Sequence, residues 1–280
     1  MTSNFIKNQN ENVIKDFGQE WERYNQRGID KKELLSLYKN YFSIFPFEKI
    51  GKNSVGFDMG CGSGRWAKFI APNVKTLNCI EPSSKALKIA QKNLRKFKNC
   101  KFENLDVMTN SLKKNSQDFG YCLGVLHHIP DTKRGLKECV DKLKVGAPFL
   151  LYLYYRFDNK PIWYKLIWFI SNILRNLISK SPFKLKLFIT KLIAVIIYFP
   201  LARLSLVLSK LRIDTSNLPI SFYKNSSLYT MQTDSLDRFG TRLEHRFTKI
   251  EILKMMENAG LVNIKFSKRS PYWVAVGEKK

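Results

Sequence analysis

One stretch decides how this chain folds: Val55-Gly56-Phe57-Asp58-Met59-Gly60-Cys61-Gly62-Ser63-Gly64-Arg65-Trp66. Its first half has the apolar character of a buried strand, and its second half is a glycine-rich turn that leads into a helix. Because glycine has no Cβ atom, Gly60, Gly62 and Gly64 allow a sharp turn and the close approach of a ligand to the backbone around Cys61. The free N–H groups at the start of the next helix can donate hydrogen bonds to such a ligand. The stretch predicts a pocket for a nucleotide-type cofactor, and a tight turn without a ligand is the alternative.

An acidic residue lies at or near the end of each of three predicted strands. The first carboxylate, Asp58, lies near the end of the first strand; the strand 76–80 is followed by Glu81, and the strand 101–105 by Asp106. Ligands of open parallel sheets bind at the carboxyl ends of the strands, so these three side chains are expected to converge on one site. A carboxylate in the position of Glu81 can accept hydrogen bonds from a ribose diol.

The fourth predicted strand runs into a pair of histidines, in the segment Phe119-Gly120-Tyr121-Cys122-Leu123-Gly124-Val125-Leu126-His127-His128-Ile129-Pro130-Asp131. With this segment, the chain resembles the class I S-adenosylmethionine-dependent methyltransferases of the bacterial type that carry Leu-His-His after the fourth strand. The resemblance covers residues 52–155 closely and resumes at 247–277. The segment Phe17-Gly18-Gln19-Glu20-Trp21 is similar to a leader segment of related methyltransferases, which is a less specific match.

This resemblance implies S-adenosylmethionine as the cofactor and a methyl transfer as the reaction. It also implies the cofactor contacts: Asp58, Gly60 and Gly62 at the methionine end, Glu81 at the ribose hydroxyls, Asp106 and Val107 at the adenine, and Leu123 against the cofactor. Together with Cys61 and Gly64 of the turn, these are the candidate cofactor-binding residues. No metal site is expected.

The order of predicted elements indicates an α/β fold, with a Rossmann-like, doubly wound and mostly parallel sheet of seven strands. We expect an N-terminal helical segment at 1–50, a cofactor-binding core at 51–155, a helical insertion at 156–246 and the completion of the core at 247–280. Asp30 can cap a helix in the first segment, and Thr248 with Glu251 forms a capping box for the last helix.

Composition places the chain in a reducing compartment. Its five cysteines, Cys61, Cys79, Cys100, Cys122 and Cys139, show no C-x-x-C spacing and fall in predicted core elements, so they are expected to be buried thiols. The N-terminal residues lack the apolar core of a secretory signal. These features predict a cytoplasmic protein.

The insertion carries a large part of the net charge of +25. Residues 159–213 contain no Asp or Glu but ten cations: Lys160, Lys165, Arg175, Lys180, Lys184, Lys186, Lys191, Arg203, Lys210 and Arg212. The longest uncharged run lies between Lys191 and Arg203 and contains Pro200, which predicts a helix too short to span a membrane. Two interpretations remain open: a helical lid that packs on the sheet, and a lid that also lies on an anionic membrane surface at the inner face of the membrane.

Three residues at the same edge of the sheet are the candidate catalytic groups: His127, His128 and Tyr154. Either histidine can accept a proton from a hydroxyl, and a structural role in orienting the loop is the alternative for both. Tyr154 follows the fifth strand and is a candidate substrate contact, or only a strand residue. Asp237, Arg238 and Arg242 are candidates for binding an acidic or sugar group of the acceptor, with surface salt bridges as their alternative.

We therefore expect methyl transfer to a small-molecule or lipid-linked acceptor, at an oxygen atom. An RNA methyltransferase is one alternative, because of the charge. The sequence after the fourth strand lacks the adjacent prolines and the aromatic residue that adenine amino-group methyltransferases carry there, so nucleic acid is the less favoured partner. A non-enzymatic membrane-surface protein with a vestigial cofactor fold is the second alternative, and the intact acids at three strand ends argue against it.

Overall fold

The computed structural model describes residues 8–280 and contains one sheet of seven strands. The strands lie in the order β3-β2-β1-β4-β5-β7-β6, and only β7 runs antiparallel to its neighbours. Their bounds are β1 Val55–Met59, β2 Thr76–Ile80, β3 Cys100–Glu103, β4 Phe119–Leu123, β5 Pro148–Tyr152, β6 Leu261–Phe266 and β7 Val274–Lys279. The predicted doubly wound, mostly parallel sheet is confirmed. The third strand is shorter than predicted, because it ends at Glu103.

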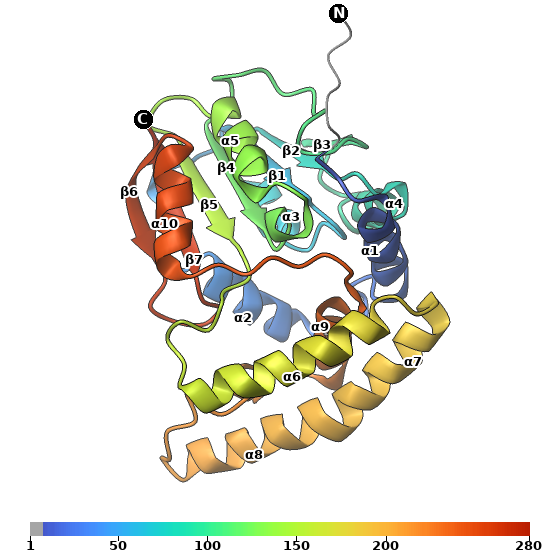
Figure 1. The fold of residues 1–280 in the computed structure, drawn as a ribbon. Helices are drawn as coiled ribbons and strands as arrows, with labels where there is room; N and C mark the ends of the chain where they lie inside the picture. Colours follow the sequence, from blue (N-terminus) through green and yellow to red (C-terminus); the bar gives the residue numbers. More distant parts are fainter. Residues whose placement is uncertain (1–7) are drawn as a thin grey trace, which may run out of the picture.

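Helices cover both faces of this sheet (Figure 1). Side chains alternate between the faces of a strand, so Phe119, Tyr121 and Leu123 of β4 join one apolar cluster while Cys122 joins the other. The helices α2 (Lys31–Tyr41), α3 (Ala67–Ile70) and α4 (Ser84–Asn93) pack on the first face. On the second face lie α5 (Thr132–Lys142) and α10 (Lys249–Asn258). All five cysteines are buried free thiols, as predicted.

Local signals in the sequence set several helix starts. The Asp30 carboxylate accepts hydrogen bonds from Lys32 N and Glu33 N at the start of α2. Thr248 and Glu251 form the predicted capping box of α10. Among the described residues of the N-terminal segment, α1 (Glu11–Arg23) precedes α2; residues 1–7 of that predicted segment lie outside the described part of the chain.

The topology reverses between β1 and β4, and this reversal creates the site. The chain moves from β1 outward to β2 and β3, then returns to β4 on the other side of β1. The loops after β1 and β4 therefore separate in opposite directions and leave a crevice at the carboxyl ends of the strands.

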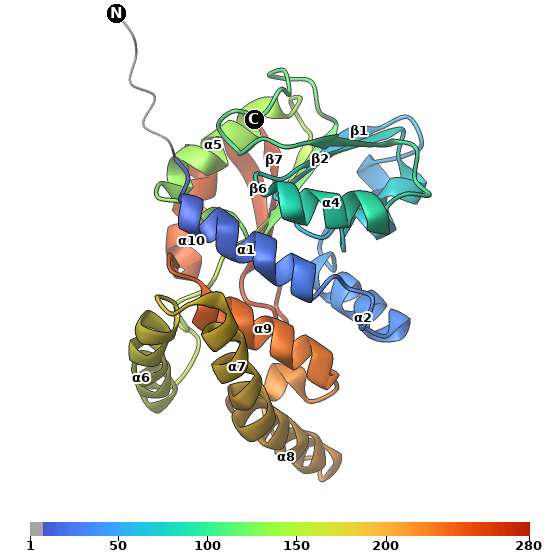
Figure 2. The ribbon, with the colours of Figure 1, turned by 90° about the vertical axis from the view of Figure 1, so that its right-hand side faces the viewer.

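The predicted insertion stands over this crevice (Figures 1 and 2). It consists of α6 (Ile162–Ile178), α7 (Phe183–Ile193), a π-helical turn (Ala194–Tyr198), α8 (Phe199–Lys210) and α9 (Leu228–Gly240). Figure 2 shows α9 between the core and α7, and α9 also contacts α1. The insertion is helical, as the sequence predicted.

One prediction about the insertion is wrong. The helix from Phe183 to Lys210, here called the long helix, runs without a break through α7, the π-helical turn and α8 for 28 residues. Among the described residues it is the one helix long and apolar enough to cross a membrane, by length and composition alone. Pro200 does not end it, because the proline is the second residue of α8, in the first turn after the π-helical turn, where a missing N–H group is tolerated.

Candidate active site

The glycine-rich turn after β1 has the backbone conformation that glycine favours. Gly60 and Gly62 have φ angles of +76° and +53°. A Cβ atom on Gly60 would lie 2.5 Å from the Val125 side chain, and one on Gly62 would lie 2.9 Å from the indole nitrogen of Trp21. Both conformation and close packing therefore require glycine at these positions. The Trp21 contact also brings α1, with its leader-like segment, over the turn.

Glu81 ties this turn to the end of β2. One carboxylate oxygen accepts a hydrogen bond from Gly62 N at 3.0 Å, and the other accepts one from Ser83 N at 2.9 Å. Burial raises the pKa of Glu81 to about 7. The carboxylate thus lies at the carboxyl edge of the sheet and lines the cavity described below.

Asp106 and its neighbours form the corresponding end of the third strand. The Asp106 carboxylate accepts hydrogen bonds from Met108 N at 2.6 Å and Thr109 N at 3.0 Å, so it also organises its own turn. The side chain of Val107 is buried beside it, and Leu123 at the end of β4 lies on the same cavity. Polar and apolar groups therefore meet here, as the binding of an adenine ring requires.

Two of the predicted cofactor-binding residues lie behind the cavity wall. Gly64 donates a hydrogen bond to Cys61 O and packs against Leu94, so it closes the turn. Asp58 is 2% exposed, and its Oδ2 atom has no hydrogen-bond partner. Burial and the neighbouring Glu81 raise the pKa of Asp58 to about 8. Neither residue is among those that line the cavity.

A cavity of about 790 Å³ begins at these strand ends and continues into the insertion. Seven of the nine predicted cofactor-binding residues line it: Gly60, Cys61, Gly62, Glu81, Asp106, Val107 and Leu123. The unpartnered Asp58 oxygen beneath the turn and the carboxylates along the wall fit a cationic adenosyl cofactor. His128 and Tyr154 also line this cavity, whereas His127 does not.

One ring nitrogen of His128, which lines the cavity, is buried and has no hydrogen-bond partner. Its Nδ1 atom lies 2.7 Å from Leu243 O, and a carbonyl oxygen only accepts hydrogen bonds, so Nδ1 carries the proton. The Nε2 atom has no hydrogen-bond partner and lies 3.8 Å from Oδ1 of Asp237, which also lacks one. Burial lowers the pKa of His128. The side chain is therefore a neutral imidazole with an available lone pair.

His127 and Tyr154 pack together next to His128 and Asp237. The rings of His127 and Tyr154 stack with their centroids 3.8 Å apart, and Tyr154 N donates a hydrogen bond to Nδ1 of His127. The Tyr154 hydroxyl donates a hydrogen bond to Oδ2 of Asp237. Burial raises the pKa of Tyr154 well above its ordinary value, so the hydroxyl remains a donor.

The sequence did not point to two further acids on the cavity wall, Glu20 of α1 and Asp234 of α9. Burial and the charges of Asp237 and Asp234 raise the pKa of Glu20, while burial raises the pKa of Asp234 to about 6. The signal available for α9 was the spacing of Asp234 and Asp237, since acids three residues apart lie on one face of a helix. No signal in the sequence connected Glu20 to that face.

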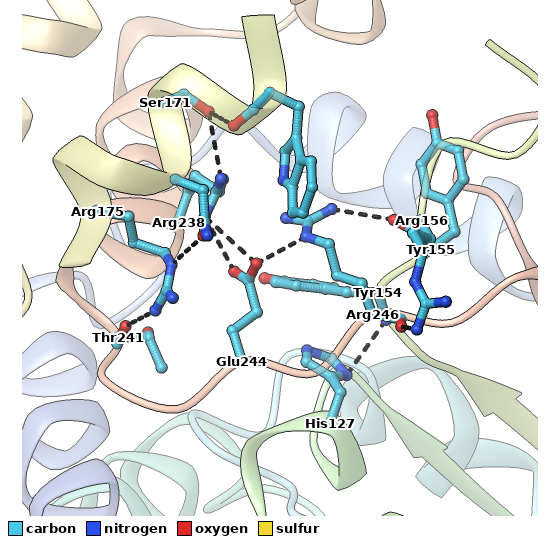
Figure 3. A network of polar contacts seen from close by, with 12 residues as sticks. His127, Tyr154, Tyr155, Arg156, Ser171, Arg175, Arg238, Thr241, Glu244 and Arg246 are labelled. Carbon is cyan, nitrogen blue, oxygen red and sulfur yellow. Dashed lines mark hydrogen bonds and ion pairs between the residues drawn. The ribbon is translucent and has the colours of Figure 1, made fainter. Parts of the chain in front are cut away.

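A buried network of ion pairs fastens the insertion to β5 (Figure 3). Glu244 accepts hydrogen bonds from Arg246 at 2.7 Å and from Arg238 at 3.3 Å. Arg246 also donates to Tyr155 O and lies over the ring of Tyr154. Arg238 is therefore held by Glu244, and Arg242 pairs with Asp16 at 3.4 Å. Of the three residues predicted to bind an acidic or sugar group, Arg238 and Arg242 therefore form ion pairs, whereas Oδ1 of Asp237 has no hydrogen-bond partner.

Known methyltransferases resemble this chain in sequence over its core and in fold over most of its length. Residues 57–151 match the family model of a methyltransferase domain, whereas no curated protein sequence matches the chain. A methyltransferase of Thermotoga maritima, described as a possible histamine N-methyltransferase, has a similar structure at 16% identity; the match covers 96% of this chain and 100% of that one, with a TM-score of 0.51. The complex of the Haloferax volcanii Trm112 activator with a putative methyltransferase matches at 11% identity over 94% and 96%, with a TM-score of 0.56.

The two solved structures have the same fold as the described residues. The family model identifies residues 57–151, the core of that fold, as a methyltransferase domain. The matched residues 57–151 contain the glycine turn, Glu81, Asp106, Leu123 and the histidine pair. The protein is therefore an S-adenosylmethionine-dependent methyltransferase, an enzyme built on the class I fold.

Proposed function

We propose that this enzyme methylates a hydroxyl oxygen of a lipid-linked acceptor at the surface of an anionic membrane. One observation carries the proposal: the cavity that begins at the cofactor-binding turn passes His128 and continues into an insertion whose outer surface is apolar. A small water-soluble acceptor needs no such extension. The proposal places the protein in the cytoplasm, bound peripherally to the inner face of the membrane.

The polar end of the cavity suits proton removal from a hydroxyl. When bound, S-adenosylmethionine supplies an activated methyl group, so the protein mainly has to position the acceptor and exclude water. The free Nε2 atom of His128 can accept the hydroxyl proton, and the carboxylate of Asp237 then stabilises the imidazolium. Tyr154 holds Asp237 in place through its hydroxyl. Because it lies outside the cavity, His127 acts through packing on Tyr154.

The outer surface of the insertion supports the membrane part of the proposal. Only 22% of the most apolar part of the long helix is buried. Large exposed apolar side chains occur along both α6 and the long helix: Ile162, Trp163, Leu166, Phe169, Ile173, Leu177, Leu185, Phe188, Leu192, Val195, Ile196, Leu204 and Val207. A soluble protein rarely exposes so much contiguous apolar area without a partner.

The exposed cations of the insertion flank this apolar surface. Of the ten cations in residues 159–213, the five exposed ones are Lys165, Lys180, Lys184, Lys210 and Arg212. Lys180 and Lys184 lie at the turn between α6 and α7, and Lys210 and Arg212 lie at the end of α8. With about 1 kcal/mol for each cation near an anionic surface, five give on the order of 5 kcal/mol at low salt. Cations at the ends of an apolar helix pair are the arrangement that an interfacial helix requires.

Polar contacts on the inner side of the long helix favour a position on the membrane rather than across it. Lys186 is 1% exposed, pairs with Asp16 at 2.8 Å and donates to Gly240 O. Arg203 donates to the carbonyl oxygens of Lys224 and Ser226. A spanning helix would have to break these contacts and place both cations in hydrocarbon, which is costly.

The same distribution argues for lipid over RNA as the partner. An RNA-binding surface requires cations spaced along a groove so that they follow successive phosphates. Here the exposed cations are separated by apolar side chains, which would gain nothing from contact with phosphates.

The proposal is tested by identifying the methylated product. The protein is incubated with methyl-labelled cofactor and either the membrane or the aqueous fraction of a bacterial extract. We expect labelled product in the organic phase of the membrane reaction, and mass spectrometry should show a methyl ether. The variant His128→Gln is the control, because it keeps the cavity but loses the free nitrogen. Label that stays with water-soluble metabolites, with amines, or with nuclease-sensitive material would contradict the proposal.

A further inference from the structure

The far end of the cavity lies between α6 and the long helix. Six apolar side chains line it there, three from each helix: Ile167, Ile170 and Leu174 from α6, and Ile193, Ile197 and Leu201 from the long helix. We call this part the tail groove. Figure 2 shows the two helices running on separate paths beneath the core.

The tail groove is open to the outside. Ile170 is 54% exposed and Ile197 is 47% exposed, although both line the cavity. Exposure of about half of each side chain indicates that the groove reaches the molecular surface. The groove therefore opens on the same apolar surface that is flanked by the exposed cations of the insertion.

Polarity changes in one direction along the cavity. Acidic and polar groups surround the cofactor-binding end, at Glu81, His128 and Asp237. Aromatic side chains line the part of the cavity inside the insertion, among them Tyr164, Trp168, Tyr198 and Tyr223. The six side chains that define the tail groove are aliphatic, with Ser171 of α6 beside them. A ligand that matches this sequence has a polar head group and a hydrocarbon chain.

We propose that the tail groove binds the hydrocarbon chain of the acceptor, which enters from the lipid bilayer between α6 and the long helix. This inference rests on the proposed function, because it concerns the same acceptor. A helix of a protein partner could cover the exposed surface, but it could not enter the cavity that continues inward past the aromatic side chains toward His128. A single alkyl or prenyl chain can follow the groove along its length.

Photo-crosslinking with a lipid probe tests the site without knowledge of the natural acceptor. Palmitic acid with a mid-chain diazirine is placed in phosphatidylglycerol vesicles, and the full-length protein is added with S-adenosylhomocysteine. After illumination, mass spectrometry locates the labelled residues. We expect label on the facing sides of residues 167–174 and 193–201.

Two neighbouring positions provide a matched pair of variants. Ile197→Trp fills the groove, and we expect labelling of the groove to fall roughly tenfold. Ile196→Trp adds the same bulk to a residue that is 66% exposed and does not line the cavity, so labelling should be unchanged. Thermal unfolding and S-adenosylhomocysteine binding verify that both variants fold.

The outcomes separate the inference from the proposed function. If vesicle binding is retained but label appears only on outward residues such as Phe188 and Val207, the tail groove is wrong and membrane docking stands. If the groove is labelled but no lipid-soluble product forms with methyl-labelled cofactor, the proposed reaction is wrong and the groove stands. If the Ile197→Trp and Ile196→Trp variants lose labelling equally, the groove does not bind the chain.

Discussion

The free Nε2 atom of His128 faces Oδ1 of Asp237 across 3.8 Å, and neither atom has a hydrogen-bond partner. His128 follows β4, while Asp237 lies on α9 of the insertion. The proposed proton acceptor is therefore assembled from two parts of the chain, and it exists only when the insertion is packed against the core. Both atoms are hydrogen-bond acceptors in this tautomer, so a hydroxyl beside the pair can donate its one proton to either of them.

The pH dependence of methyl transfer should reveal this pair. His128 must be neutral to accept a proton, so turnover should fall as the pH drops through its pKa, which burial lowers from 6.5. The carboxylate of Asp237 raises that pKa, so Asp237→Asn should move the acidic limb to still lower pH while reducing the plateau rate. His128→Gln should lower kcat by roughly 10² or more and remove the limb. An NMR titration of the three histidines measures the pKa directly.

An unchanged acidic limb in both variants would contradict a role of this pair in proton transfer. A loss of turnover caused only by misfolding would appear as weaker S-adenosylhomocysteine binding, which is measured in parallel by calorimetry.

Cofactor affinity should depend on the ionisation of Glu81. Only the ionised carboxylate can accept hydrogen bonds at both oxygens. Burial raises the pKa of Glu81 to about 7, so affinity for S-adenosylhomocysteine should increase as the pH rises through about 7. Glu81→Gln should weaken binding roughly tenfold to a hundredfold, as expected for a lost charged hydrogen bond, and should flatten the pH dependence. Calorimetry at a series of pH values measures both effects.

Glu103→Gln is the matched control for Glu81, because Glu103 ends the neighbouring strand but bonds to Ser111 outside the cavity. Its affinity should equal that of the wild type. Equal losses in the two variants would show that the effect is not specific to the turn.

The stability of the cofactor-free protein should fall with rising pH because of Asp58. Its folded-state pKa of about 8 lies above the ordinary 3.8, so the stabilisation is complete at low pH and is lost as the pH rises toward about 8. Asp58→Asn should flatten this loss by up to about 1.4 kcal/mol per pH unit. Urea unfolding of both proteins across this pH range provides the comparison. Asp30→Asn, at an exposed helix cap, is the control. It should leave the dependence of the free energy of unfolding on pH near neutrality unchanged.

Glu244 should contribute strongly to the attachment of the insertion. Glu244→Gln leaves Arg238 and Arg246 buried without their shared carboxylate, and breaking a buried pair in this way costs about 3 kcal/mol or more. The free energy of unfolding should fall accordingly, and limited proteolysis should cut the insertion before the core. Glu22→Gln breaks only the exposed pair with Lys85 and should cost less than about 1 kcal/mol. Similar losses in both variants would mean that the network does not hold the insertion.

The exposed lysines between α6 and α7 should contribute to vesicle binding. Replacing Lys180 and Lys184 by Gln should weaken binding to phosphatidylglycerol vesicles roughly thirtyfold at low salt, because each of the two cations contributes about 1 kcal/mol near an anionic surface. Higher salt should reduce the difference. Cosedimentation measures the affinity. The double change of Lys88 and Lys92 to Gln removes the same charge from the exposed side of α4 and should have little effect.

If the α4 variant loses as much affinity as the Lys180 and Lys184 variant, binding would follow net charge and not the surface of the insertion.

Much of the cofactor-binding core could be predicted from the sequence, because its signals are local. The alternation of apolar residues, the glycine turn and the acids after successive strands each occupy a few neighbouring residues, and parallel strands bring their carboxyl ends together. The buried cysteines and the capping box at Thr248 and Glu251 follow from similarly short patterns. For the same reason, Glu81 and Asp106 were predicted and line the cavity; Leu123, which the family resemblance implied, lines it too.

The acceptor side depended on the tertiary structure. Asp237 meets His128, and Glu20 meets Asp234, only because α1 and α9 pack over the crevice, and no sequence period connects such distant positions. The continuity of the long helix through Pro200 was likewise decided by the π-helical turn and by packing on α9. The sequence thus determined the cofactor cradle through local backbone chemistry, whereas long-range burial decided which polar groups of the acceptor side remain free and what their pKa values are.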